Sequence, residues 1–166
     1  MTWRELLDRH GPALLLYARQ WTGSRSDAED AVQDGFLRFW RSRGSLDPST
    51  EGCLPMLFTS VKWSAIDGGR SRKRRLVRED TAASLMENTC EVFECDVDRE
   101  ERSKDMQKAL GELPAEQREA LVLKIWGGLT FQTIAGMLEI PMSTAASRYR
   151  YALASLRRKL REREKV

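Results

Sequence analysis

The sequence predicts an all-α protein built from two small helical domains. Apolar residues recur at helical spacing along most of the chain, and no strand-like alternation runs for more than a few residues. A chain of 166 residues, 41% of them hydrophobic, is long enough to bury a core in each of two small domains. We expect helices over residues 3–22, 27–42, 55–75, 97–111, 114–126, 130–138 and 143–162.

An acidic segment divides the two predicted domains. Residues 80–96 show no clear helical period, and Glu79–Asp105 carries ten acidic against three basic residues. The flanking segments are basic, because Arg70–Arg78 carries six basic residues and Arg148–Val166 carries eight. We therefore expect a first domain over 1–78, a flexible acidic linker over 79–97 and a second domain over 98–166. Two basic blocks separated by an acidic one predict two surfaces that face a polyanion.

Several protein classes are excluded by the bulk properties of the chain. No apolar run is long enough to cross a bilayer and the N-terminus has no signal pattern, so we expect a cytoplasmic protein without membrane insertion. Three scattered cysteines argue against a disulfide scaffold. Cys90 and Cys95 with the single His10 do not form a zinc ligand set, so no metal or cofactor is expected. Without a nucleophile–base pair or a glycine-rich phosphate loop, the chain is not expected to be an enzyme.

The helix expected over 27–42 is strongly amphipathic. At 100° per residue, one face is apolar and consists of Ala28, Val32, Phe36, Phe39 and Trp40. The opposite face consists of Asp27, Asp30, Gln33, Asp34 and Leu37. A solvated face is the simpler interpretation of this pattern, but an apolar Leu37 among polar residues also favours a protein partner.

The helix expected over 55–75 combines a core face with cations and one aromatic residue. Its core face consists of Leu57, Phe58, Val61, Ala65 and Ile66. Its other residues offer Lys62, Trp63, Arg70, Arg72, Lys73 and Arg74. Cations beside an aromatic ring suit single-stranded or melted nucleic acid, in which phosphates need neutralising and bases can stack. The alternatives are a tryptophan buried in the core and a basic helix end that is merely solvated.

Residues 129–160 have the pattern of a helix-turn-helix. Thr130 is a good N-cap, residues 139–141 form the turn, and Ser143 is expected to cap the second helix. The start of that second helix should reach base edges through Ser143, Thr144, Ala146, Ser147 and Arg150. Arg148, Arg157 and Arg158 are better placed for phosphates. The alternative is a plain helical hairpin with solvated charges.

These three segments, in this order, resemble the extracytoplasmic function (ECF) sigma factors of bacterial RNA polymerase over nearly the whole chain. DAEDAVQDGFLRFWR is similar to their region 2.2, and LFTSVKWSAIDGGRSRKRR to regions 2.3 and 2.4. The stretch from Leu113 to Leu160 is similar to region 4. Trp63 stands where the family usually has Asn, and Ser143 where it usually has Gly. We expect no further module before the first helix.

The resemblance implies roles for three sets of residues. The residues implied to contact the clamp helices of the largest catalytic subunit of core RNA polymerase are Asp27, Asp30, Gln33, Asp34, Phe36 and Leu37. The residues implied to contact the melted −10 element are Lys62, Trp63, Asp67, Arg70, Arg72, Lys73 and Arg74. Those implied to contact the −35 duplex are Ser143, Thr144, Ala146, Ser147, Arg148, Arg150 and Tyr151.

The expected function is therefore promoter selection by a non-catalytic subunit that binds core RNA polymerase and promoter DNA. A cognate anti-sigma factor is a further expected partner. The alternative is a stand-alone helix-turn-helix repressor or activator. A regulator of that class would need a dimer interface and a ligand-binding or receiver domain. Neither is evident in the sequence, although helices within 97–126 could dimerise.

Overall fold

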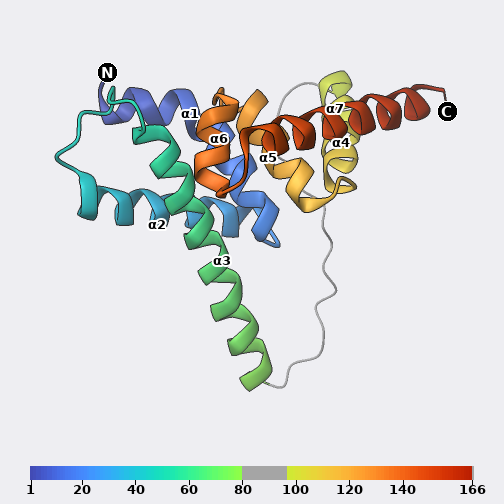
Figure 1. Ribbon diagram of the computed structural model, residues 1–166. Helices are drawn as coiled ribbons and strands as arrows, with labels where there is room; N and C mark the ends of the chain where they lie inside the picture. The colour runs from blue at the N-terminus through green and yellow to red at the C-terminus, as the bar shows by residue number, and fades with distance from the viewer. Residues whose placement is uncertain (80–96, 166) are drawn as a thin grey trace. The chain divides into compact units, whose positions relative to one another are not determined.

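The computed structural model describes the backbone of residues 1–79 and 97–165, and the side chains of residues 1–75 and 104–165. The chain divides into two compact units, Met1–Thr89 and Cys90–Val166. Every regular element within the described residues is helical, which confirms the all-α prediction (Figure 1). The predicted linker boundaries, Cys90 and Cys95 lie outside the described side chains, so the limits 79–97 stay a prediction.

Over its described residues, 1–79, the first unit contains three α-helices and one short 3₁₀ turn. In chain order these are α1 (Trp3–Ala18), η1 (Arg19–Trp21), α2 (Arg25–Arg43) and α3 (Cys53–Glu79). A capping box starts α1, because the Thr2 hydroxyl accepts from the Glu5 N–H at 3.2 Å and the Glu5 carboxylate accepts from the Thr2 N–H at 2.7 Å. The Ser24 side chain starts α2 by accepting from the Asp27 N–H at 3.1 Å.

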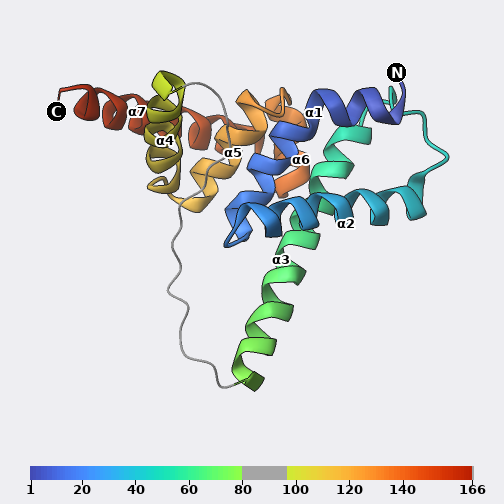
Figure 2. The same cartoon turned by 180° about the vertical axis from the view of Figure 1, so that it is seen from behind.

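The core of the first unit lies where α1, α2 and α3 meet (Figure 2). Leu14 from α1 and Leu57 and Phe58 from α3 are fully buried, and Tyr17 packs edge-on against Phe58 with ring centroids 5.2 Å apart. At Gly35 the backbones of α2 and α3 approach closely, since a Cβ there would lie 2.6 Å from the Cα of Val61. The Ser60 hydroxyl donates to the Gly35 carbonyl at 2.7 Å across the same contact.

The buried face of α2 differs from the predicted one. It consists of Ala28, Ala31, Gly35 and Phe39, whereas Trp40 is exposed and Val32 and Phe36 are half-buried. The prediction was wrong in weighting the large apolar side chains, because the small residues at 31 and 35 are what allow α3 to approach. The aromatic residues pack instead around Trp3 of α1, whose ring centroid lies 5.4 Å from that of Trp40.

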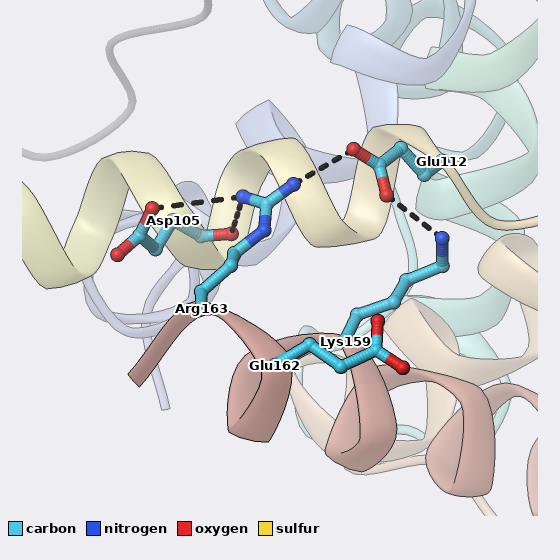
Figure 3. A pocket seen from close by; sticks show the side chains of 5 residues that line it. All are labelled: Asp105, Glu112, Lys159, Glu162 and Arg163. Carbon is cyan, nitrogen blue, oxygen red and sulfur yellow. Dashed lines mark hydrogen bonds and ion pairs between the residues drawn. The ribbon is translucent and has the colours of Figure 1, made fainter. Parts of the chain in front are cut away.

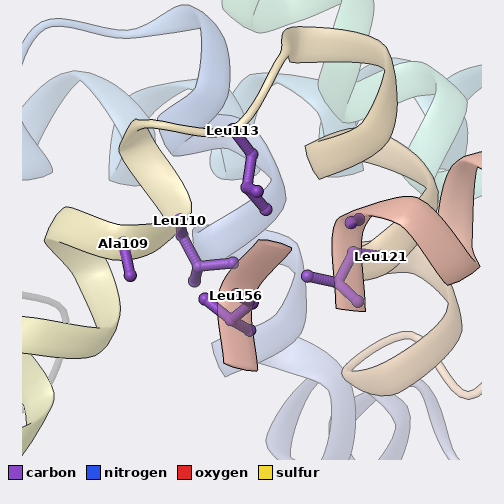
Figure 4. Close-up of a cluster of buried hydrophobic side chains, with 6 residues drawn as sticks. Ala109, Leu110, Leu113, Leu121 and Leu156 are labelled. Atoms are coloured by element: carbon purple, nitrogen blue, oxygen red, sulfur yellow. The ribbon is translucent and has the colours of Figure 1, made fainter. Parts of the chain in front are cut away.

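The second unit contains α4 (Val97–Gly111), α5 (Ala115–Ile125), α6 (Phe131–Leu138) and α7 (Met142–Glu164). One hydrophobic cluster joins α4, α5 and α7 (Figure 4). It consists of Ala109, Leu110, Leu113, Leu121, Ala152 and Leu156. Because α7 supplies the last two of these residues, the long basic helix is anchored along the middle of its length.

The helix-turn-helix is formed by α6 and α7, as the sequence predicts. The Thr130 hydroxyl caps α6 by accepting from the Thr133 N–H at 3.1 Å. Glu139 adopts a left-handed conformation (φ 54°), and the Ile140 N–H closes the turn on the Ala135 carbonyl at 3.0 Å. The prediction that Ser143 caps the next helix was wrong. Helix α7 begins at Met142 with Pro141 as its N-cap, because the Pro141 carbonyl already accepts from the Thr144 and Ala145 N–H groups.

A network of ion pairs joins the end of α4 to the end of α7 (Figure 3). The Glu112 carboxylate contacts Lys159 Nζ at 2.7 Å and the Arg163 guanidinium at 2.7 Å. The Arg163 guanidinium also donates to the Asp105 carbonyl at 3.1 Å. The network therefore fixes α4 against the C-terminal half of α7, beyond the apolar cluster.

Replacing Glu112 with glutamine is expected to lower the melting temperature of the second unit in neutral but not in acidic solution. The hydrogen bond from Lys159, with the nearby cations, holds the pKa of Glu112 below its ordinary value. A carboxylate with a lowered pKa stabilises the fold above its unfolded pKa, and this contribution is lost as pH falls through its folded pKa.

Thermal unfolding followed by circular dichroism at about pH 7 and about pH 3 measures this difference. Glu164→Gln is the control, because Glu164 is an exposed carboxylate at the end of α7, the helix that carries Lys159 and Arg163. An equal effect of Glu112→Gln at both pH values would contradict the proposed linkage.

Candidate nucleic-acid interface

The acidic face of α2 is exposed along most of its length. Asp30, Gln33 and Asp34 are exposed, and Leu37 is 47% exposed beside them. Their spacing of three and four residues puts them on one side of the helix, away from the face that packs on α3. We refer to these four residues as the acidic face. An exposed leucine at the end of such a face suits a protein surface that is basic and partly apolar.

Asp27 and Phe36 belong to the same predicted set but are placed differently. The Asp27 side chain is only 13% exposed and forms an ion pair with Arg72 of α3. Phe36 is half-buried, with its ring 6.0 Å from that of Trp3 and 6.2 Å from that of Trp40. Neither residue presents its side chain as freely as the acidic face does.

Helix α3 has one buried face and one exposed face, as predicted. Leu57, Phe58 and Val61 are fully buried, whereas Trp63 is 52% exposed, which excludes a core role for that ring. Lys62 places its Nζ 5.1 Å from the centroid of the Trp21 ring. This distance fits a cation–π contact, which places the ammonium over a ring of η1.

Beyond Trp63, α3 continues as an exposed helical segment rich in arginine and lysine. It passes through Gly68 and Gly69 without a break, and every described residue from 68 to 75 is exposed. We refer to residues 70–75 as the basic segment. Arg72 pairs with Asp27, while Asp67, just before the two glycines, pairs with Arg38 of α2 at 2.9 Å. Such exposure fits both a DNA-binding surface and a solvated helix end.

The start of α7 presents the small polar residues that were predicted to face duplex DNA. Ser143 is exposed, Thr144, Ala146 and Ser147 are half-buried, and Tyr151 is among the most exposed large side chains. The Arg150 guanidinium donates to the Ser147 hydroxyl at 3.3 Å. These contacts leave the first two turns of α7 accessible at the surface of the second unit.

A surface depression of about 360 Å³ lies between the starts of α5 and α7. It brings together Ser143, Thr144, Ser147, Arg148 and Tyr151 with Pro114, Glu116 and Gln117. Glu116 and Gln117 of α5, and its N-cap Pro114, were not predicted to lie here. Arg148, predicted to face phosphates, instead pairs with Glu116 at 3.1 Å. Glu116 is visible in the sequence as an acidic residue in the first turn of α5. Helical periodicity, however, does not show which other helix that turn faces.

Other chemistry is not evident in the described residues. They contain no cluster of three or more His, Cys, Asp or Glu side chains that could hold a metal ion. Cys53 is buried at the start of α3, and its burial raises the pKa of the thiol, which disfavours the reactive thiolate. In the same ranges, no helix is both long and apolar enough to serve as a membrane span.

Comparison with known proteins gives consistent matches for both units. The family model of Sigma-70 region 2 matches residues 6–75, and that of Sigma-70 region 4 matches residues 103–156. The ECF RNA polymerase sigma factor SigL of Mycobacterium tuberculosis is 31% identical over 161 residues, which is 96% of this chain and 89% of SigL.

Two solved structures share the fold over 96% of this chain, each at 25% sequence identity. One is the sigma factor RpoE in complex with the anti-sigma factor NepR from Bartonella quintana, with a TM-score of 0.67 and 96% of that chain covered. The other is CnrH in complex with the cytosolic domain of CnrY, with a TM-score of 0.61 and 87% covered. By its two matched regions and its similarity to SigL over nearly the full length of both chains, this protein belongs to the ECF RNA polymerase sigma factors.

Proposed function

We propose that the chain binds core RNA polymerase and directs it to promoters, acting in the cytoplasm without catalytic activity of its own. The observation that carries this proposal is the succession, in one chain of this family, of an exposed acidic face, an exposed basic segment and a helix-turn-helix. Family membership removes the main support for a stand-alone repressor or activator. Because two fold relatives are solved with anti-sigma partners, an anti-sigma factor is also part of the proposal.

The acidic face of α2 is the proposed contact to the clamp helices of the largest polymerase subunit. Asp30, Gln33 and Asp34 supply charge and hydrogen-bond acceptors, and Leu37 supplies apolar area at the end of the same face. A protein partner is favoured over nucleic acid here, because two carboxylates on one face would repel phosphates.

The exposed side of α3 is the proposed contact to the melted −10 element. Arg70, Lys73 and Arg74 are exposed cations, and Trp63 offers a ring on which an unpaired base can stack. Stacking on one aromatic side chain contributes about 1–3 kcal/mol per base. Duplex DNA offers no free base face to such a ring, so Trp63 favours the melted strand.

The start of α7 is the proposed reader of the −35 duplex. A helix-turn-helix places the N-terminal residues of its second helix against base edges in the major groove. Ser143, Thr144 and Ser147 can each donate or accept a single hydrogen bond there, and the methyl group of Ala146 can contact a thymine methyl. Arg150 can also reach a base edge, whereas Arg148 flanks this surface and suits a phosphate.

The test is co-purification of the full chain with core RNA polymerase, followed by run-off transcription from a genomic DNA library. We expect a stable complex and a limited set of transcripts that are absent with core polymerase alone. Binding to duplex DNA without any binding to core polymerase would contradict the proposal and revive the repressor or activator alternative.

Removing the acid that pairs with Arg148 is expected to strengthen DNA binding. Glu116→Gln leaves the Arg148 guanidinium without its carboxylate partner, so the guanidinium can contact phosphate without first breaking an ion pair. Exposed ion pairs contribute about 0.2–1 kcal/mol, so we expect affinity for duplex DNA to rise about 1.4- to 5-fold.

Fluorescence anisotropy with a labelled random-sequence duplex measures the effect of Glu116→Gln. Glu162→Gln removes one negative charge elsewhere in the second unit and serves as the control, because Glu162 lines a different depression, beside Glu112. Equal gains from both variants would assign the effect to net charge rather than to Arg148.

A further inference from the structure

We propose that Asp27 is a positioning residue for the basic segment of α3, and not a contact to core polymerase. The observation behind this proposal is the Asp27–Arg72 ion pair, which joins the first turn of α2 to the exposed end of α3. The proposal rests on the proposed function only in that the basic segment is taken to bind DNA.

The Asp27 carboxylate is built into the fold of the first unit. Its backbone N–H donates to the N-cap Ser24 at 3.1 Å, which fixes it in the first turn of α2. The Arg72 guanidinium donates through one terminal nitrogen to Asp27 Oδ1, and its other terminal nitrogen lies against Asp27 Oδ2, a charge-assisted contact that orients the arginine. Asp30 and Asp34, in the following turns, are instead exposed. Asp27 therefore differs from the other polar residues predicted to contact polymerase, because it is paired within the unit and they are exposed.

The basic segment needs such an attachment because little else holds it. The two consecutive glycines before it each favour a helix by about 1 kcal/mol less than alanine. A Cβ at Gly68 would contact nothing within 4 Å, and one at Gly69 would meet only the Trp21 carbonyl at 3.6 Å. Within the described side chains of residues 70–75, Arg72 is the one joined to another helix.

A second ion pair marks where the firmly packed part of α3 ends. Arg38 of α2 holds Asp67 at 2.9 Å, just before the two glycines. The pairs at Asp67 and Arg72 thus attach α3 to α2 on both sides of the glycines. We infer that the first pair fixes the part of α3 that carries Trp63, and that the second fixes the direction of the cations beyond it.

Arg72 can serve DNA while it stays paired. A guanidinium carries five N–H donors, and the hydrogen bond to Asp27 Oδ1 occupies one of them. The Arg72 side chain is 54% exposed, so its remaining donors are accessible from solvent. Asp27 therefore orients Arg72 for a phosphate and holds the exposed Arg70, Lys73 and Arg74 in register with it.

Hydrogen exchange of the free full-length chain tests the attachment without polymerase or DNA. Asp27→Asn is expected to speed amide exchange over residues 70–75 about tenfold, the effect of losing a charge-assisted contact of about 1.4 kcal/mol. Arg72→Gln breaks the same pair from the other side and should give the same local effect, which guards against a folding defect at α2. Asp30→Asn, a matched loss of one carboxylate from α2, should leave exchange over 70–75 unchanged.

Holoenzyme assembly separates positioning from polymerase contact. We expect Asp27→Asn to bind core polymerase like the wild type but to bind a labelled random-sequence single-stranded oligonucleotide about tenfold more weakly in the holoenzyme. Asp27→Glu keeps the charge and should restore part of this binding. Asp30→Asn should instead weaken assembly with core polymerase.

Two results would overturn the positioning role. One is unchanged exchange over residues 70–75 in both Asp27→Asn and Arg72→Gln. The other is a loss of core polymerase affinity in Asp27→Asn as large as that in Asp30→Asn. Failure of the wild-type chain to bind core polymerase would count against the proposed function alone, because the exchange measurement does not depend on it.

Discussion

Alanine at position 35 is expected to lower the free energy of unfolding of the first unit by about 3 kcal/mol. The added Cβ would lie 2.6 Å from the Cα of Val61 and 2.8 Å from its side-chain methyl and backbone nitrogen. Two of these atoms are backbone, so rotation of a side chain cannot relieve the overlap and α2 must move away from α3. That movement would also stretch the hydrogen bond from Ser60 to the Gly35 carbonyl.

Urea denaturation of the full chain, followed by tryptophan fluorescence, measures the loss at Gly35. Gly68→Ala is the matched control, because Gly68 lies inside α3 and a Cβ there would meet nothing within 4 Å. Better helix propensity should make that control more stable by about 0.5–1 kcal/mol. A Gly35→Ala variant as stable as the control would show that the two helices are not in close backbone contact.

The double substitution Asp30→Arg with Asp34→Arg is expected to reduce affinity for core RNA polymerase at least about 100-fold. Like charges placed across an interface cost several kcal/mol, and each 1.4 kcal/mol is a tenfold change in affinity. Both side chains are exposed, so the substitutions should not disturb the core of the first unit. Titration of fluorescently labelled chain with core polymerase measures the change.

Asp8→Arg supplies the control for charge reversal in the first unit. Asp8 is an exposed acid on α1, outside the acidic face, so its reversal should leave assembly nearly unchanged. Circular dichroism should show the same helical content for the wild type and both variants. Assembly of the double variant at wild-type affinity would mean that the acidic face does not contact polymerase.

Local pattern predicted the elements well where one helix could be considered alone. The spacing of apolar residues and the Thr130 cap place α4 and α6 within a residue of their observed bounds. The helix expected over 55–75 does run through the glycines at 68 and 69, but α3 continues four residues further, to Glu79. The Ser143 cap failed because the carbonyl of Pro141, a residue without its own N–H, already begins α7.

The functional surfaces were less predictable because they depend on contacts between helices. Exposure of the acidic face follows from periodicity and could be predicted. For Trp63 the sequence left a buried position in the core open, and only the structure shows that the ring is exposed. The partners of Arg72 and Arg148 could not, since Asp27 lies 45 residues away in sequence and Glu116 lies on another helix. The same limit explains the buried face of α2, where Gly35 matters through its closeness to Val61 rather than through its own hydrophobicity.

The ion pairs of Arg72 with Asp27 and of Arg148 with Glu116 also bear on counterion release during DNA binding. An unpaired arginine that reaches a phosphate neutralises it and frees close to one condensed cation from the DNA. An arginine that keeps its carboxylate partner brings almost no net charge, so it frees almost none. Such a residue adds directional hydrogen bonds but little entropy of released ions. Arg72, which can stay paired with Asp27, is therefore suited to fixing the register of the nucleic acid, whereas Arg148 adds its charge only when it leaves Glu116. Arg70, Lys73 and Arg74 supply the general attraction.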